Sequence, residues 1–355
     1  MDRPVEQAGL PGHTHGIILD AMHLGLTFDL QTDPSDWRQA EFDPLPTVQA
    51  LQRSLESLGH HVTLLGSALD VARGGRERCC DVDLVFNIAE GAHGRCREAW
   101  APMVLELFGV PYVGSDPLAL AVGLDKVMTK RLAAAHGLRT PAWLCVDRPQ
   151  ALPDPLPLAF PVIVKPRYEG SGIGIDPSSV VRDAAALQAR VAWACERFAQ
   201  PVLVEEFIEH GELTVCIIGN DPPRVLPAIQ RPLDPVSRLS CHVAGRASGQ
   251  GTLAPLELDQ RLESQAQEAA LTLFDALGCR DMARADFRVD GQGHVYFLEI
   301  NPLPSFDPEG TIGLLAEHLG CRYADLIGEV LEAALIRLGS PPQRQSRVSQ
   351  TALQP

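Results

Sequence analysis

Residues 283–302 read ARADFRVDGQGHVYFLEINP, and this stretch decides the fold. Two runs rich in apolar residues flank Asp290-Gly291-Gln292-Gly293, a sequence typical of a tight hairpin turn. We therefore predict two antiparallel strands, over residues 283–289 and 294–300. A tight turn places the ends of two such strands side by side, so polar side chains there can meet.

Three oxygen-bearing side chains occupy those strand ends: Asp286, Glu299 and Asn301. Two carboxylates and an amide carbonyl match the oxygen ligands that Mg²⁺ prefers. Glu299 stands in a run that otherwise reads as buried strand, and a buried carboxylate is costly unless a cation accompanies it. We predict a metal site here; the alternative is a solvated hairpin with ordinary acidic residues.

A glycine-rich loop follows another apolar strand. Residues 160–166 read FPVIVKP, and residues 169–174 read EGSGIG. Glycines let backbone N–H groups approach a polyphosphate, and Lys165 at the strand end can neutralise its charge. The Gly-Lys-Ser/Thr of a P-loop is missing, and the loop is too long for a dinucleotide fingerprint. Beside a metal site, this loop indicates phosphate binding.

The first third of the chain alternates between strand-like and helix-like segments. The expected strands cover residues 16–19, 62–65, 83–88 and 110–114, and the expected helices cover residues 47–58 and 97–108. This alternation predicts a parallel α/β sheet with ligand loops at the carboxyl ends of its strands.

The rest of the chain predicts two α+β units. The central unit has strands at residues 160–166 and 202–208, and helices at 125–136 and within 180–198. The third has a strand at 212–219, a helix at 259–277, the hairpin and a helix at 323–338. The predicted domains are 15–123, 124–210 and 211–338, with disordered ends at 1–14 and 339–355.

Composition excludes several classes of function. The 355 residues carry a net charge of −15, which argues against a nucleic-acid partner. No apolar run approaches the roughly 20 residues of a membrane span, and no signal peptide is evident. The nine cysteines are scattered and are expected to be reduced thiols. We expect a cytoplasmic enzyme without a membrane partner.

These features, in this order, resemble the ATP-grasp superfamily, and within it the D-alanine–D-alanine ligase family. The resemblance covers about residues 16–338. It is carried by VFNIAEG at 85–91, LDK at 124–126, VIVKP at 162–166, the loop at 170–174, Glu205, Glu212 and the stretch from Arg284 to Asn301. It implies an N-terminal parallel α/β domain, a small central α+β domain and a C-terminal α+β domain.

The resemblance also implies roles for individual residues. ATP would be held by Lys126, Lys165, Gly170, Ser171, Gly172, Glu205, Glu206, Phe207, Ile208 and Glu212. Two Mg²⁺ ions, for which Mn²⁺ is a candidate substitute, would be held by Asp286, Glu299 and Asn301. Arg284 would stabilise the acyl phosphate and the tetrahedral intermediate, and Ser171 belongs to the loop that closes over the phosphates. The segment at 230–255 is expected to act as a second lid.

The expected substrate residues depart from the family pattern. The family's substrate-binding glutamate is absent from residues 24–30, which we place after the first strand, and its ω-loop is not recognisable at 230–251. Instead we single out His93 and Arg95 for a carboxylate, and Ser305, Asp307 and Glu309 for the second substrate. The two acids would repel a carboxylate and attract an ammonium group. The alternative is that both segments are ordinary surface loops without a role in substrate binding.

The expected activity is that of an ATP-dependent carboxylate–amine ligase acting on amino acids or dipeptides. It would proceed through an acyl phosphate and release ADP and phosphate. Two alternatives stay open: D-alanine–D-alanine synthesis for the cell wall, and a regulatory protein that binds nucleotide without turnover. The expected partners are ATP and amino-acid-like substrates, and the resemblance adds a homodimer as a further option.

Overall fold

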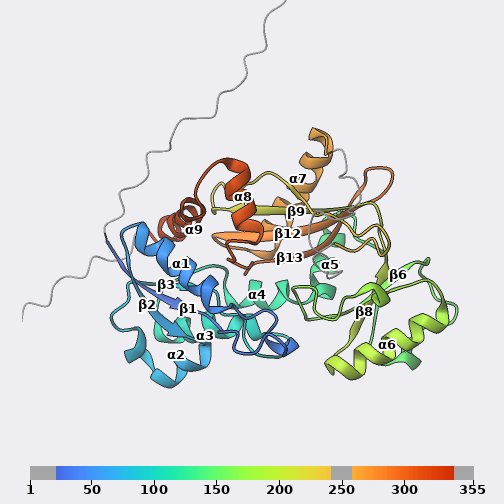
Figure 1. Cartoon of the computed structure of the whole chain (residues 1–355), viewed down its shortest axis with the longest axis horizontal. Helices are drawn as coiled ribbons and strands as arrows, with labels where there is room; N and C mark the ends of the chain where they lie inside the picture. Colours follow the sequence, from blue (N-terminus) through green and yellow to red (C-terminus); the bar gives the residue numbers. More distant parts are fainter. Residues whose placement is uncertain (1–20, 241–257, 340–355) are drawn as a thin grey trace, which may run out of the picture.

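The computed structural model describes residues 21–240 and 258–339, which form three sheets with their helices (Figure 1). The N-terminal sheet has the order β2-β1-β3-β4 and is parallel throughout. Its strands are β1 (His23–Thr27), β2 (His61–Gly66), β3 (Leu84–Asn87) and β4 (Tyr112–Val113). Its helices are α1 (Leu45–Ser57), α2 (Ala68–Gly74), α3 (Trp100–Phe108) and α4 (Pro117–Gly123). The predicted parallel α/β architecture is confirmed.

Strand β1 occupies a segment that we expected to follow the first strand. Residues 24–30, which we placed after that strand, begin with most of β1, where Leu24 and Leu26 are fully buried. The segment that leaves the strand toward the ligand side therefore starts later, at Phe28. The strand expected at 16–19, the start at 1–14 and residues 340–355 of the expected tail lie outside the described residues.

The central sheet is antiparallel, with the order β5-β8-β6-β7. It consists of β5 (Trp143–Val146), β6 (Val162–Pro166), β7 (Val180–Val181) and β8 (Val202–Glu206). Helix α6 (Ala184–Phe198) covers one face with Leu187, Val191 and Ala194, which recur at helical spacing. Helix α5 (Lys126–Ala135) connects this unit to the rest and begins at Asp125, whose carboxylate caps its first N–H groups.

The C-terminal sheet has the antiparallel order β10-β9-β12-β13, and β11 also pairs with β9. Its strands are β9 (Gly211–Ile218), β10 (Arg224–Val225), β11 (Ile229–Gln230), β12 (Met282–Val289) and β13 (Val295–Asn301). The predicted hairpin is thus confirmed. The remaining helices are α7 (Gln260–Leu277), α8 (Thr311–Leu319) and α9 (Tyr323–Arg337).

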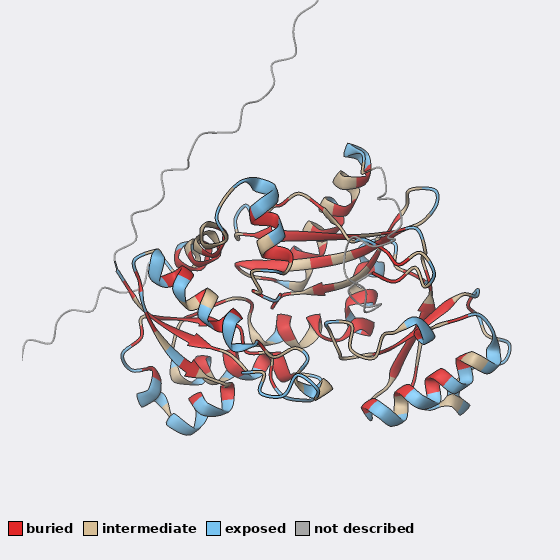
Figure 2. Ribbon diagram, viewed as in Figure 1, coloured by how far each residue is buried: buried red, intermediate tan, exposed pale blue. Residues whose placement is uncertain are grey.

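One hydrophobic core joins the N-terminal and C-terminal sheets. Leu51 and Leu55 of α1 belong to the same buried cluster as Ile327 and Leu331 of α9. Figure 2 shows this buried layer, together with buried residues along all three sheets. The central sheet has a core of its own, so the site lies where a shared body meets a separately packed unit. Within the described ranges, no helix is long and apolar enough to cross a membrane.

Candidate active site

The hairpin β12–β13 carries acidic residues on one face of the C-terminal sheet. Asp286 lies directly opposite Glu299 in the register of the two strands. The register shifts immediately after this pair, leaving Leu298 as an extra residue between Phe297 and Glu299. A bulge of this kind re-aims side chains. It lets Phe297 pack into the core, where it is 1% exposed, while Glu299 stays on the polar face.

Arg284 and Asn301 extend the same polar face, because they pair two positions further along the strands. Arg284 donates to one oxygen of Asp286 through two nitrogen atoms, at 3.1 and 2.9 Å. The hydroxyl of Thr214 donates to the other oxygen at 2.7 Å. Burial by itself lowers the pKa of Arg284, but the charge of Asp286 outweighs burial and raises it. Arg284 is therefore a permanent cation in the site.

Lys126, at the start of α5, reaches the other acid of the pair. Its Nζ lies 2.8 Å from a carboxylate oxygen of Glu299 and donates to the carbonyl of Glu169 at 2.5 Å. Burial raises the pKa of Glu299, but the charges of Lys126 and Lys165 outweigh burial and hold it at about 2. Glu299 is therefore ionised at neutral pH, as a metal ligand must be.

The chemistry of these side chains fits a divalent cation. Asp286, Glu299 and Asn301 supply carboxylate and amide oxygen atoms on a shared face, the donor set that Mg²⁺ and Mn²⁺ accept. In the described part of the chain, no group of three or more His, Cys, Asp or Glu residues is arranged to hold a metal. An ion here would therefore depend on Asn301 and on oxygen atoms from phosphate or water.

Two buried lysines flank Glu205 on β8. Lys165 on β6 and Lys130 on α5 lie 2.5 and 2.6 Å from its two carboxylate oxygens. Burial raises the pKa of Glu205, but the two lysines outweigh burial and lower it. Burial lowers the pKa of Lys130 to about 8, although Glu205 opposes this. Because both lysines engage its carboxylate, a contact between Glu205 and adenine stays a prediction.

The segment expected to contact the nucleotide base follows Glu205. The N–H groups of Glu206 and Phe207 donate to backbone carbonyls at 2.9 Å each, and Ile208 is the second residue after the strand. Glu212 on β9 lies 3.3 Å from Arg288 on β12, and burial raises the pKa of that carboxyl. The guanidinium of Arg288 also stacks over the Phe207 ring, 4.9 Å from its centre. These contacts bring the predicted base-binding and ribose-binding residues together.

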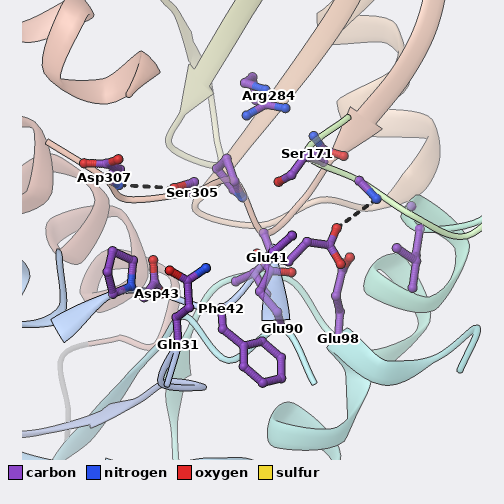
Figure 3. A pocket seen from close by; sticks show the side chains of 18 of the residues that line it. Gln31, Glu41, Phe42, Asp43, Glu90, Glu98, Ser171, Arg284, Ser305 and Asp307 are labelled. Atoms are coloured by element: carbon purple, nitrogen blue, oxygen red, sulfur yellow. Dashed lines mark hydrogen bonds between the residues drawn. The ribbon is translucent and has the colours of Figure 1, made fainter. Parts of the chain in front are cut away.

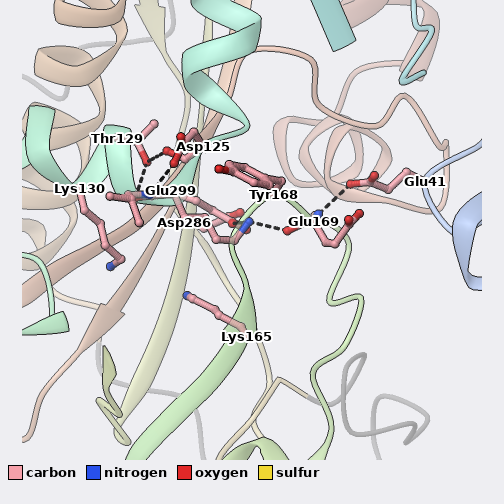
Figure 4. Close-up of polar contacts among 12 residues, drawn as sticks. Glu41, Asp125, Thr129, Lys130, Lys165, Tyr168, Glu169, Asp286 and Glu299 are labelled. Carbon is pink, nitrogen blue, oxygen red and sulfur yellow. Dashed lines mark hydrogen bonds and ion pairs between the residues drawn. The ribbon is translucent and has the colours of Figure 1, made fainter. Parts of the chain in front are cut away.

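The glycine-rich loop is tied to the N-terminal domain through Glu41. The Glu41 carboxylate accepts the N–H of Gly170 at 2.8 Å and pairs with the buried Arg97 (Figure 4). Arg97 also lies 3.2 Å from Glu169. Ser171 has a φ of 48°, a left-handed conformation that lifts the loop away from strand geometry. The structure thus places the predicted loop residues at the mouth of the site.

A cavity of about 290 Å³ opens between this loop and the C-terminal sheet. Among the predicted residues, it is lined by Lys126, Gly170, Ser171, Arg284, Asn301, Ser305 and Asp307. Figure 3 shows Arg284 on one side and a set of acidic side chains on the opposite side. The cavity therefore adjoins residues that we predicted to contact the phosphates, and its volume can hold small molecules.

Those acids are residues that sequence reasoning missed: Glu41, Asp43, Glu90 and Glu98. Burial and neighbouring acids raise the pKa of Glu98 to about 8 and that of Glu90 well above its usual value. Glu90 stands in the quoted motif at 85–91, which is the one signal that could have singled it out. Glu41 lies in the loop after β1, beyond residues 24–30, where we looked for the family's glutamate.

Three predicted substrate residues do not line this cavity. His93 packs edge-on against Trp100, Glu309 is exposed, and the side chain of Arg95 is 59% exposed. Arg95 approaches Asp125 at 3.3 Å instead. Two positions later, Arg97 is 3% exposed, and it is this arginine that reaches the loop.

Comparisons with known proteins agree with this geometry. The family model described as D-ala D-ala ligase C-terminus matches residues 132–332. A D-alanine–D-alanine ligase of Synechococcus sp. is 32% identical over 297 residues, which are 82% of this chain and 89% of the relative. An uncharacterized protein of Sinorhizobium fredii, y4sG, is 34% identical over 255 residues, which are 71% of this chain and 74% of the relative.

Solved structures share the fold. A D-alanine–D-alanine ligase of Bacillus anthracis, complexed with ATP, has a TM-score of 0.70 at 23% identity, with coverage of 89% of this chain and 98% of that one. The VanG D-Ala:D-Ser ligase of Enterococcus faecalis has a TM-score of 0.70 at 20% identity, covering 89% and 100%. The chain therefore belongs to the D-alanine–D-alanine ligase family and is an ATP-dependent, ADP-forming carboxylate–amine ligase with the ATP-grasp fold.

Proposed function

We propose that this ligase joins two amino-acid-like substrates, or an amino acid and a dipeptide, through an acyl phosphate formed in the cavity below the glycine-rich loop. The observation that carries this proposal is the position of Arg284. It lines the substrate cavity and belongs to the same sheet face as Asp286 and Glu299. A group on that face can contact both the phosphate and the carbonyl that the phosphate activates.

In the first step, a substrate carboxylate oxygen attacks the γ-phosphorus of ATP, and the bond to the ADP oxygen breaks. Lys126 and Lys165 offset the charge of the phosphates, and Arg284 orients the carboxylate. Asp286, Glu299 and Asn301 would hold two Mg²⁺ ions, or Mn²⁺ in their place, which neutralise charge on the phosphates. Glu212 would bind the ribose, and residues 205–208 the base.

In the second step, the amine nitrogen attacks the acyl carbonyl, loses a proton, and phosphate leaves with its bridging oxygen. Arg284 and N–H groups of the loop around Ser171 stabilise the negative charge on the carbonyl oxygen. An acyl phosphate hydrolyses readily, so the site must exclude water. The loop at 170–172 would provide this cover, held in place by Glu41. Residues 241–255 of the expected second lid lie outside the described residues.

The domain division at 15–123, 124–210 and 211–338 is part of this proposal, because each unit contains one of the three sheets. A cytoplasmic location follows from the need for ATP. A homodimer stays a prediction of the family resemblance.

The test uses the full chain with ATP, Mg²⁺ and a panel of D- and L-amino acids and dipeptides. We expect ADP formation that requires a substrate, together with a new mass equal to the two substrates minus water. Hydroxylamine, offered in place of the amine, should trap the acyl phosphate as a hydroxamate. ADP formation with neither amide nor hydroxamate would contradict the proposal. D-alanyl-D-alanine as the best product would instead identify the cell-wall reaction.

A variant of Arg284 makes the test specific. Arg284→Met keeps a side chain of similar length without the charge, and we expect kcat to fall about a hundred-fold or more. If amide formation continued at the normal rate in this variant, Arg284 would not stabilise the reacting carbonyl.

A further inference from the structure

Asp43 is a buried acid that faces the cavity without a partner. It lines the cavity and is only 8% exposed (Figure 3). Its backbone is fixed, because its N–H donates to Asp29 at 3.0 Å and its carbonyl accepts the N–H of Gln31 at 2.9 Å. Within residues 21–240 and 258–339, nothing forms a hydrogen bond or ion pair with its carboxylate. A buried acid without a partner costs stability, so its retention needs a reason.

A second acid faces the same end of the cavity from the other domain. Asp307 lies in the loop between β13 and α8, and its carboxylate accepts only the N–H of Glu309, at 3.0 Å, among the described residues. Ser305 and Gln31 line the cavity beside the two acids. Burial raises the pKa of Asp43 to about 7, and the charges of Asp307 and Asp29 add to this effect. The acids of this end therefore repel each other.

The cations of the cavity do not relieve this repulsion. Lys126 and Arg284 line the cavity but are engaged with Glu299 and Asp286 at 2.8 and 2.9 Å. Arg97 is engaged with Glu41 and Glu169. The end formed by Asp43 and Asp307 thus holds two acids that the described cations lining the cavity do not pair, and it lies next to a site that handles small amines.

A metal ion fits this end less well than an ammonium group. In the described part of the chain, no cluster of three or more acids, histidines or cysteines could hold an ion. Two carboxylates would leave Mg²⁺ or Ca²⁺ dependent on several waters to complete its shell of six or more oxygen ligands. A primary ammonium has three N–H donors, which match two carboxylates and one neutral acceptor.

We infer that Asp43 and Asp307 form a subsite for a primary ammonium group, so that the amine substrate carries a second basic nitrogen, as diamines and diamino acids do. The inference rests on the proposed ligase reaction, and it specifies the class of one substrate. The ammonium at Asp43 and Asp307 anchors the molecule. The other nitrogen attacks the acyl phosphate as a free amine, loses its proton, and forms the amide while phosphate leaves.

Matched probes test this subsite by binding, independently of turnover. L- and D-lysine and 1,4-diaminobutane are titrated calorimetrically into the full chain in the presence of Mg²⁺ and a non-hydrolysable ATP analogue. L- and D-norleucine and butylamine serve as monoamino counterparts of nearly the same shape, because each lacks the second ammonium group. We call the first set the dicationic probes, after their two ammonium groups, and expect at least one to bind about ten-fold or more tightly than its monoamino counterpart. Equal or weaker binding of all the dicationic probes would overturn the inference.

Three variants locate the effect. Asp43→Asn and Asp307→Asn keep the shape of each side chain and remove its charge. Each should weaken binding of the preferred dicationic probe by about ten-fold and leave binding of its monoamino counterpart unchanged. Asp33→Asn removes a charge from an exposed position on the same segment and should have no effect. Thermal unfolding of each variant confirms that it is folded. Unchanged preference in both pocket variants, or an equal loss in Asp33→Asn, would overturn the subsite.

Measurements of ADP and amide formation distinguish a failure of this inference from a failure of the proposed function. ADP and amide formation with monoamino substrates, without any preference for the dicationic probes, would leave the ligase proposal standing and overturn the subsite. Dicationic binding that depends on Asp43, without ADP formation on any substrate, would support the subsite and contradict the proposed reaction.

Discussion

The two sides of the substrate cavity differ in whether their acidic side chains have cationic partners. On the side of the C-terminal sheet, the acids that we propose as metal ligands are paired with cations: Asp286 with Arg284, and Glu299 with Lys126. On the side of the N-terminal domain, Asp43 and Glu98 are more than nine-tenths buried, yet no described residue bonds to their carboxyl groups. We call the first the matched side, because its charges are paired before substrate arrives. We call the second the unmatched side. Its acids lack partners until a ligand supplies them, so we expect this side to determine specificity.

The largest expected effect tests the matched side. Glu299→Gln keeps the shape of the side chain but removes the charge that a divalent cation needs. We expect kcat to fall about a thousand-fold, the loss of several kcal/mol of transition-state stabilisation. ADP release under saturating ATP and substrates measures it. Chelation of divalent ions in the unmodified protein should abolish activity in the same way, and Mn²⁺ should restore it.

The control for this variant is a neighbouring carboxylate outside the site. Asp290→Asn keeps an acceptor for the N–H groups of Gln292 and His294 in the turn that joins the same two strands, and should leave kcat within about two-fold, because the turn lies away from the pair of Asp286 and Glu299. Near-normal turnover in Glu299→Gln would remove Glu299 from the metal site and break the contrast between the two sides.

The matched side could be predicted from the sequence because its determinants are local. A turn of four residues fixes the hairpin, and residues two apart on a strand share a face, so Arg284 and Asp286 had to lie together. The position of Glu299 on that face depends on the bulge at Leu298, and no local sequence pattern predicts this bulge. The prediction held because a hydrophobic neighbour, Phe297, has the core as its only favourable place.

The unmatched side could not be predicted, because tertiary contacts build it. Asp43 reaches the cavity through a bridge to Leu30 that closes an irregular loop after β1, and such loops have no periodic pattern. Arg97 replaces Arg95 as the buried arginine because the chain turns through a short 3-10 helix at Arg97–Ala99, which rotates neighbouring side chains apart. Sequence spacing alone does not distinguish two arginines so close together.

A second prediction concerns the ion pairs of Glu205 in the central sheet, where an acid is also matched by cations. In Lys130→Met, Glu205 loses one of its two partners in a buried region. We expect the free energy of unfolding to fall by about 3 kcal/mol, because removing one member of a buried ion pair leaves a charge poorly compensated. Urea denaturation measures this. The double variant Lys130→Met/Glu205→Gln should recover part of the loss, and its failure to do so would mean that packing, not charge, stabilises this network.

A third prediction concerns the unmatched side, where removing a charge should stabilise the fold. The pKa of Asp43 is about 7 in the folded protein and 3.8 in the ordinary carboxyl, so the folded state binds more protons between these values. Stability should therefore fall as the pH rises through this window. The free energy of unfolding of Asp43→Asn should exceed that of the unmodified protein by on the order of 2 kcal/mol at pH 8. Near pH 4 the two free energies should be equal.

Unfolding free energies are compared between Asp43→Asn and the unmodified protein at both pH values. Asp29, Asp307 and Tyr323 also face this end, but both proteins contain them, so the difference reports the Asp43 carboxyl group alone. A variant that is less stable than the unmodified protein at pH 8 would mean that Asp43 has an unrecognised cationic partner. Greater stability together with weaker binding of a dicationic probe would instead indicate that the acid is retained for function.

The smallest expected effect concerns the arginine that sequence reasoning selected. Arg95→Ala removes an exposed side chain whose contact with Asp125, at 3.3 Å, is shared with a closer pair to Arg167 at 2.7 Å. We expect a change in unfolding free energy below about 0.5 kcal/mol and a change in KM below about two-fold for either substrate. A ten-fold rise in KM for the carboxylate substrate alone would reinstate Arg95 as its ligand. The unmatched side would then extend to this loop, and the substrate carboxylate would bind outside the cavity that Arg284 faces.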